Sequence, residues 1–256
     1  MCNTPAIQII KLNKHYLIAN KCAGILCQPT LSSNTTKKKE KVLLNILKEQ
    51  LAHNKSGLAA HLKNIHRIDK VVTGGVLFAT NKNSAQMFSR YLRKGGNCGF
   101  KLKRRYLAIL QSPIFIKNDP EQGIISFKNK STGSSASPMI THYKKISKNL
   151  YAFELCTGQK HQIRVTCKTK LRSPILNDIK YGAKPIKNFN DEIIALHSAM
   201  MRITIGRNEP ESTLIPMPKS EYYPLWEPFL NTTTGYFHEY INKVLLDDSW
   251  GTVLFE

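Results

Sequence analysis

Residues 66–79 read HRIDKVVTGGVLFA, a group of charged residues that runs through a glycine turn into an apolar segment. The Thr-Gly-Gly step at 73–75 predicts a turn, and residues 76–79 predict a short buried strand. Asp69 lies before this turn, among cations that favour the ionised carboxylate that a nucleophile needs. On composition alone, a surface aspartate neutralised by its neighbours is the simpler interpretation. Asp69 is therefore a candidate catalytic residue that needs support from the rest of the chain.

A second informative stretch, residues 157–164, reads TGQKHQIR. Its glycine predicts a turn that leads into a strand over 162–167, in which Gln162 and Arg164 share one face. An arginine there suits bidentate pairing with a buried carboxylate, although a contact with phosphate alone would also explain it. Tyr106, which follows three consecutive cations, suits stacking on a nucleobase, or is simply a core residue of a strand.

The remaining pattern predicts short strands and a few amphipathic helices. The predicted strands are 7–10, 16–19, 106–110, 151–155 and 195–205. The predicted helices are 43–51, 83–94 and 237–245, the second capped by Asn83 and stopped by Gly95-Gly96. Residues 55–63 and 210–228 are predicted as loops, and Asp178, among turn signals, as a backbone cap. Strands and helices do not alternate regularly, which favours an α+β class.

The charge is large, positive and unevenly placed. The 256 residues hold 38 Lys and Arg against 17 Asp and Glu, a net charge of +21, yet residues 211–256 sum to −5 and residues 1–210 to +26. This predicts that nucleic acid or an anionic membrane surface docks on the first part of the chain, with the acidic end away from it. A generally lysine-rich solvated surface is the alternative.

Several function classes lack their signature. The six cysteines form neither a CxxC pair nor a Cys/His cluster at zinc spacing, so the sequence predicts no metal site and a reduced compartment. No apolar run approaches the roughly 18 residues of a membrane span. The first 20 residues show no signal-peptide pattern and no arginine-rich presequence.

Taken together, these stretches resemble the RluA-type pseudouridine synthases. The chain shows, in order, that family's HRLD…(S/T)G signature, its TGRTHQIR motif and its shorter landmarks. The matching residues are Lys21, Ala23-Gly24, His66-Arg67-Ile68-Asp69, Thr73-Gly74, Arg105-Tyr106-Leu107-Ala108, Thr157-Gly158, His161-Gln162-Ile163-Arg164, Ser173-Pro174-Ile175-Leu176, Asp178, Tyr181-Gly182 and Leu196-His197-Ser198. The departures include Cys22 for proline, Gly75 for leucine, Gln159-Lys160 for Arg-Thr and Asn177 for glycine.

The resemblance implies a fold and an organisation. It implies a single pseudouridine synthase catalytic domain over 1–256, with a mixed, mainly antiparallel central sheet and flanking helices. The family landmarks occupy 16–205, and an acidic extension with a helix follows at about 211–256. Because the first catalytic strand already occupies 16–26, an S4-type RNA-binding domain is not expected.

The resemblance also implies roles for individual residues. Asp69 would be the catalytic carboxylate that drives cleavage of the uridine C–N bond and rejoining through C5, and Arg164 would pair with it. Tyr106 would stack on the flipped uracil and assist deprotonation at C5. The implied substrate-binding residues are Arg67, which would replace the flipped base in the helix, Leu196, His66, His161 and Gln162. The reaction needs no metal and no cofactor.

The expected partner is structured RNA, bound by a monomer without an obligate protein partner. The lysine- and asparagine-rich composition is similar to small fungal members of the family, which implies mitochondrial large-subunit (21S) rRNA and a mitochondrial location; tRNA, and the cytoplasm or nucleus, are the alternatives. Two other classes stay open. One is a non-catalytic basic rRNA-binding or ribosome-assembly protein. The other is a glycoside hydrolase, which would need a second carboxylate that no motif places beside Asp69.

Overall fold

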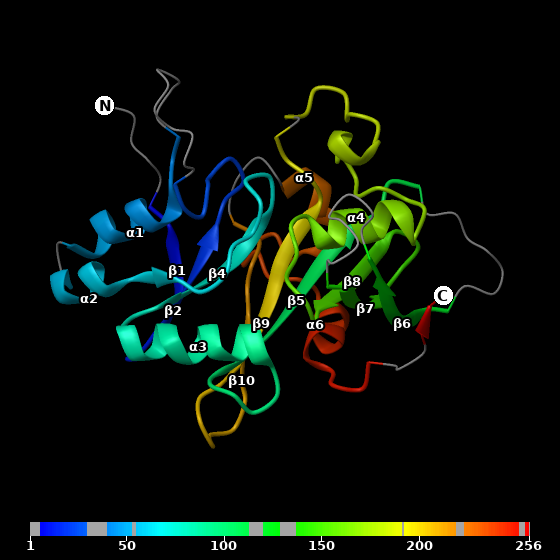
Figure 1. The fold of residues 1–256 in the computed structure, drawn as a ribbon. Coiled ribbons are helices and arrows are strands. Elements are labelled where there is room, and N and C mark those ends of the chain that lie inside the picture. Colours follow the sequence, from blue (N-terminus) through cyan, green and yellow to red (C-terminus); the bar gives the residue numbers. More distant parts are fainter. Residues whose placement is uncertain are drawn as a thin grey trace.

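The structure, a computed structural model, describes residues 6–29, 40–52, 55–112, 120–128, 137–190, 192–218, 223–250 and 254–255. Within these ranges one long sheet runs through the molecule (Figure 1), in the order β1-β2-β4-β9-β5-β8-β7-β6-β11, with β10 paired to β9 and β3 to β4. The strands are β1 (Gln8–Leu12), β2 (Tyr16–Lys21), β3 (Lys63–Asn64), β4 (Thr73–Ala79), β5 (Lys101–Ile109), β6 (Gln122–Phe127), β7 (Met139–Lys145), β8 (Leu150–Leu155), β9 (Leu196–Thr204), β10 (Glu211–Leu214) and β11 (Leu254–Phe255). Neighbouring strands pair antiparallel except β4 with β9 and β6 with β11. The α+β class and the mixed, mainly antiparallel sheet are confirmed.

The helices flank this sheet. They are α1 (Leu43–Ala52), α2 (Ser56–His61), α3 (Lys82–Lys94), α4 (Gln162–Thr169), α5 (Tyr223–Trp226) and α6 (Glu239–Leu246). The leucine stripe of α1 faces the core, since Leu43, Leu47 and Leu51 are buried. The N-cap of α3 is Asn81, whose side chain accepts a hydrogen bond from the Ser84 amide, so the predicted cap at 83 was two residues late. The predicted stop is confirmed by the left-handed φ of 66° at Gly95.

The predicted strand over 162–167 is wrong, because these residues form the first part of helix α4. All six side chains are buried, so no polar face shows a helical period in the sequence. The polar residues Gln162, Arg164 and Thr166 alternate with apolar ones, which is the period of a strand. The helix begins abruptly, because His161 at its N-terminus takes a left-handed backbone conformation with φ 57°.

Other boundaries also differ from the predicted ones. The predicted loop at 55–63 contains α2, and the predicted connection at 210–228 contains β10 and α5. These elements are short, with six residues in α2 and four each in β10 and α5, and too short to show a period. The C-terminal helix α6 begins at Glu239, two residues later than the apolar pattern predicts.

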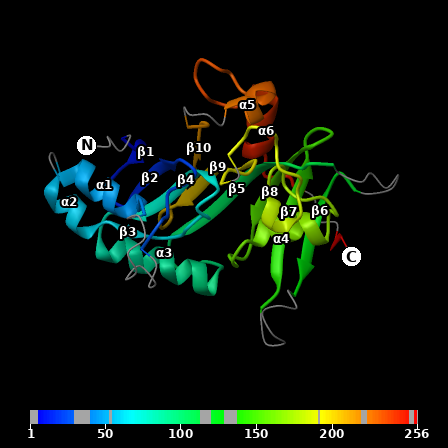
Figure 2. The ribbon, with the colours of Figure 1, turned by 90° about the horizontal axis from the view of Figure 1, so that it is seen from above.

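The acidic C-terminal part contributes helices α5 and α6 to the side of the sheet opposite to α3 (Figure 2). Its anchor is Arg105 of β5, whose Nε donates to Glu154 at 2.7 Å and whose Nη1 donates to the Leu245 carbonyl at 2.8 Å. The Trp250 ring covers the guanidinium at 4.3 Å. In the parts of the chain that the structure describes, no helix is long and apolar enough to cross a membrane.

Candidate active site

The loop that carries Asp69 is held from behind by two buried polar side chains. Lys21, fully buried on β2, donates from Nζ to the carbonyl oxygens of Cys22, Ile25 and Lys70 at 2.9, 3.0 and 3.1 Å. Burial lowers the pKa of Lys21 to about 8. His66 Nε2 accepts a hydrogen bond from the Leu77 amide at 3.1 Å, which ties the start of the loop to β4. The loop is therefore fixed by contacts on its inner side.

His66 is thus placed where it supports the backbone. Its side chain is buried, and burial lowers its pKa to about 3, so the ring is neutral. The resemblance implied a substrate contact for this residue, which also lines the larger groove that runs past the end of α3. Arg67, the next residue, is exposed on the outer side of the loop.

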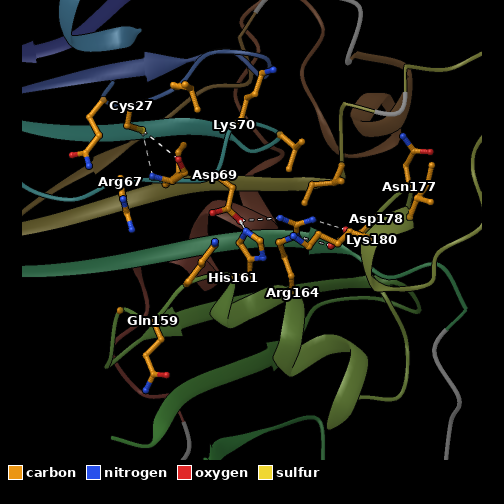
Figure 3. A pocket seen from close by; sticks show the side chains of 18 of the residues that line it. Cys27, Arg67, Asp69, Lys70, Gln159, His161, Arg164, Asn177, Asp178 and Lys180 are labelled. Carbon is orange, nitrogen blue, oxygen red and sulfur yellow. Dashed lines mark hydrogen bonds and ion pairs between the residues drawn. The ribbon is translucent and has the colours of Figure 1, made fainter. Parts of the chain in front are cut away.

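Asp69 faces open space and meets two side chains from the 161–164 region (Figure 3). Its carboxylate is 28% exposed, and Oδ2 accepts a hydrogen bond from Arg164 Nη1 at 3.1 Å. His161 Nε2 lies 3.7 Å from the same oxygen. The expected pairing of Asp69 with Arg164 is present in the geometry, through Oδ2 of the carboxylate.

Arg164 itself is fixed by a second carboxylate, Asp178. Arg164 Nε and Nη2 each donate to Asp178 at 2.7 Å, a bidentate pair, and the Asp178 side chain is only 1% exposed. The Tyr181 ring lies 5.0 Å from the guanidinium carbon. Burial lowers the pKa of Arg164, but the hydrogen bonds and charges of Asp178 and then Asp69 raise it above its ordinary value. The bidentate partner that the sequence suggested for Arg164 is therefore Asp178.

Sequence reasoning assigned Asp178 only a capping role, and this was wrong, because its side chain makes no cap contact at the turn that follows it. The turn is instead built by Asn177, which takes a left-handed φ of 64°. Asn177 Nδ2 donates to the carbonyls of Asn190 and Ile193, and its Oδ1 accepts from the Ile186 amide. Asparagine tolerates this conformation, which explains how it replaces the family's glycine.

His161 and Gln162 organise the other wall. Burial lowers the pKa of His161, and its Nδ1 lies 2.8 Å from the Tyr181 hydroxyl, which orients a neutral ring toward Asp69. Gln162 is buried, its amide oxygen accepting from Thr157 Oγ1 and the Gln159 amide and its nitrogen donating to β7. The side-chain amide of Gln162 thus makes all four of its hydrogen bonds within the protein, and two of them hold the 157–159 loop.

A small recess of about 60 Å³ opens beside Asp69. Its apolar walls include Tyr106 from β5 and Leu196 from β9, each only 4% exposed. Burial raises the pKa of Tyr106, so the phenol is neutral. The recess brings together the predicted site residues Arg67, Asp69, Tyr106, His161, Gln162, Arg164 and Leu196. His66 is the one predicted site residue that does not line it.

Two larger grooves meet at Arg67, on either side of the recess. The first, of about 750 Å³, is the Asp69 groove; its cationic lining residues are Arg67, Lys70, Lys160, Arg164 and Lys180. The second, of about 790 Å³, is the α3 groove; its cationic lining residues are Arg67, Arg93, Lys94, Lys103 and Arg104. A long anionic ligand can therefore pass on both sides of Arg67 while one group enters the recess.

This geometry can present one carboxylate to a group held between an aromatic ring and a leucine. Asp69 is the carboxylate with open access, because Asp178 is buried and both of its oxygens accept from Arg164. Two-carboxylate glycoside hydrolysis needs a second acid free to donate a proton. Asp178 does not offer one, so the arrangement disfavours a glycoside hydrolase.

Comparison with known proteins gives one consistent answer. The sequence model of the family described as RNA pseudouridylate synthase matches residues 15–169. A 21S rRNA pseudouridine(2819) synthase of Eremothecium gossypii is 36% identical over 251 residues, covering 96% of this chain and 90% of that protein. The protein of the same name from Saccharomyces cerevisiae is 37% identical, covering 94% of this chain and 96% of that one. A solved structure, human RNA Pseudouridylate Synthase Domain Containing 4, is similar in fold with a TM-score of 0.60 at 19% identity, over 82% of this chain and 88% of that one.

Proposed function

The chain belongs to the RNA pseudouridylate synthase family and is an RNA pseudouridine synthase, an isomerase. We propose that it converts a uridine of mitochondrial large-subunit rRNA to pseudouridine, with Asp69 as the catalytic carboxylate. The observation that carries this proposal is the ion-paired Asp69 at the mouth of the Tyr106–Leu196 recess, where two cationic grooves meet.

Asp69 would act on a nucleoside that has left its stack. The C1′–N1 bond breaks, the uracil turns, C1′ bonds to C5, the C5 proton leaves and N1 gains a proton. Attack by the Asp69 carboxylate on the sugar or the base, and removal of the 2′ proton, are alternative ways to start this sequence. Each needs the carboxylate placed against the nucleoside, and the hydrogen bond from Arg164 Nη1 fixes the direction in which Asp69 points.

The recess would receive the flipped base. Tyr106 offers a ring face for stacking, and Leu196 closes the opposite side. The neutral phenol of Tyr106 stacks without placing a charge against the uracil. Arg67, exposed where the two grooves meet, would fill the place that the base leaves in the RNA.

The choice of substrate rests on the relatives. The two yeast proteins are named for 21S rRNA, and this chain spans at least nine tenths of each. We therefore assign mitochondrial 21S rRNA as the substrate and the mitochondrion as the location. The chain would act as a monomer on structured RNA, without an obligate protein partner.

The test combines purified protein with two transcripts, a 21S rRNA fragment and a tRNA pool, and maps pseudouridine at single-nucleotide resolution. Wild-type protein should modify one uridine of the rRNA, and Asp69→Asn should modify none while still binding it. Glu209→Gln, at an exposed carboxylate outside the recess and both grooves, is the control and should act like wild type. Modification of tRNA alone would reject the rRNA assignment, and an active Asp69→Asn variant would reject the role of Asp69.

A further inference from the structure

A buried arginine lies in the wall of the α3 groove. Arg104, on β5 two residues before Tyr106, is only 7% exposed, and its Nε has no hydrogen-bond partner. Among the residues that the structure describes, no carboxylate forms an ion pair with this guanidinium, although its neighbour Arg105 is bound by Glu154 at 2.7 Å. A charge buried without a partner is costly, so such a residue indicates an anionic ligand that completes it.

The surroundings of Arg104 fit a polynucleotide backbone. The groove is lined by Arg67, Arg93 and Lys94, all exposed. Its one carboxylate among the described lining residues is Glu154, which is engaged by Arg105 at 2.7 Å and by Lys103 at 3.7 Å. The groove therefore carries uncompensated positive charge along its length.

The groove also offers surfaces for bases. Tyr91 and Leu92, at the end of α3, line it beside the cations, and Leu92 is 38% exposed. The opposite wall is the 157–159 loop, where Gly158 lies next to the Arg104 guanidinium, since a Cβ built on it would be 3.7 and 3.8 Å from Nη2 and Nη1. Cations beside an aromatic and an aliphatic side chain are the usual surface for single-stranded nucleic acid.

We propose that the α3 groove binds the RNA strand on one side of the target nucleotide, with Arg104 binding a backbone phosphate. This rests on the proposed function, because the groove shares Arg67 and Tyr106 with the catalytic recess. A strand that leaves the recess past Arg67 enters the groove at once. Arg104 and Tyr106 alternate with Lys103 and Arg105 along β5, so the phosphate site and the base site share one face.

The experiment measures binding of a fluorescein-labelled 12-nucleotide single-stranded RNA by anisotropy, over a range of salt concentrations. Arg104→Gln should weaken binding at least tenfold at 0.1 M salt and reduce the slope of log K against log salt by about 0.7, the value for one phosphate contact of a single strand. Lys94→Gln, at the exposed rim, should weaken binding two- to fivefold. Arg90→Gln, an exposed arginine of α3 outside the groove, is the matched control and should bind within twofold of wild type.

A thermal melt separates this role from a structural one. Arg104→Gln removes an unpaired buried charge, so its melting temperature should equal or exceed that of wild type. A lower melting temperature with RNA affinity and salt slope unchanged would overturn the proposal, and so would full competition by polyglutamate of equal charge, which would indicate an acidic protein as the ligand. The Asp69→Asn variant keeps the two proposals apart, because it tests the catalytic role and should still bind RNA. A negative isomerase assay would count against the proposed function but not against the measured RNA affinities. Unchanged RNA binding by Arg104→Gln would count against the groove proposal but not against the isomerase activity.

Discussion

Arg164 donates two hydrogen bonds of 2.7 Å to Asp178 but only one, of 3.1 Å, to Asp69. The stronger pair lies in the interior, where Asp178 is buried, and the weaker one lies at the 28% exposed side chain of Asp69, which lines the recess. The guanidinium is therefore fixed by Asp178 and presents its remaining nitrogen, Nη1, to Asp69. An arginine serves two carboxylates in this way because its five donors lie in one rigid plane.

Replacing Arg164 with lysine tests this geometry. A single ammonium cannot make the bidentate pair with Asp178 and also reach Asp69, so the turnover rate should fall at least 100-fold, about 2.7 kcal/mol in the activation free energy. RNA affinity should change less than threefold, because the charge is kept. Single-turnover rates and filter binding measure the two effects. An unchanged rate would reduce Arg164 to a phosphate contact.

Asp178→Asn should act through Arg164. The amide keeps the shape but offers one acceptor oxygen where the carboxylate offered two, so the guanidinium loses its bidentate anchor and part of its counter-charge. We expect a loss of about 3 kcal/mol in the free energy of unfolding, since the pair is buried, and a fall in turnover with little change in RNA affinity. Urea melts and single-turnover rates measure these. Asp178→Glu should recover more of the turnover than Asp178→Asn, and a rate that tracks stability alone would contradict the positioning role.

The sequence indicated which residues belong to this site better than it indicated which side chains contact one another. Asp69 and Arg164 could be paired before the structure was known, because the stretches at 66–69 and 161–164 resemble known motifs. The role of Asp178 could not, since a carboxylate in a turn has the same local signature whether it caps backbone or binds a distant side chain. The unpaired state of Arg104 likewise depends on which carboxylates the fold brings near it.

The same distinction holds for the fold. Leu43, Leu47 and Leu51 gave a helix with a visible period because one face of α1 is solvated. Helix α4 was mistaken for a strand because residues 162–167, QIRVTC, alternate polar and apolar side chains, and their burial on all sides leaves no solvated face with a helical period. Burial thus removed the local signal for secondary structure where the site is built.

Stability should fall on mild acidification because of two buried, neutral histidines. Burial lowers the pKa of His66 to about 3 and that of His197 to about 4. In the unfolded chain a histidine has an ordinary pKa near 6.5. Between the folded pKa values and about pH 6.5, the unfolded chain therefore binds more protons than the folded one, and the free energy of unfolding falls as the pH drops below about 6.5. From pH 7.5 to pH 5 we expect a loss on the order of 2 kcal/mol for each histidine.

Urea melts at pH 5 and pH 7.5 measure this loss. His197 Nδ1 lies 2.9 Å from Thr73 Oγ1 and Nε2 lies 3.1 Å from the Ile215 carbonyl, so His197→Gln should lower stability at pH 7.5 but reduce the pH dependence. Equal stability of the wild type at both pH values would contradict burial of the neutral rings.

Arg105 and Arg104 are adjacent on β5 but should behave in opposite ways. Arg105 is 1% exposed and joins Glu154, the Leu245 carbonyl and the Trp250 ring, so it fastens the C-terminal segment to the sheet. Arg105→Gln leaves Glu154 and that carbonyl with fewer partners, and should lower the free energy of unfolding by about 3 kcal/mol. It should also expose Trp250, measured as increased iodide quenching of tryptophan fluorescence. Since Arg105 faces away from the α3 groove, the RNA salt slope should stay as in wild type, whereas Arg104→Gln should change the slope and leave quenching unchanged. Loss of RNA binding in both variants, in step with their stabilities, would show that the two arginines have one structural role and not two separate ones.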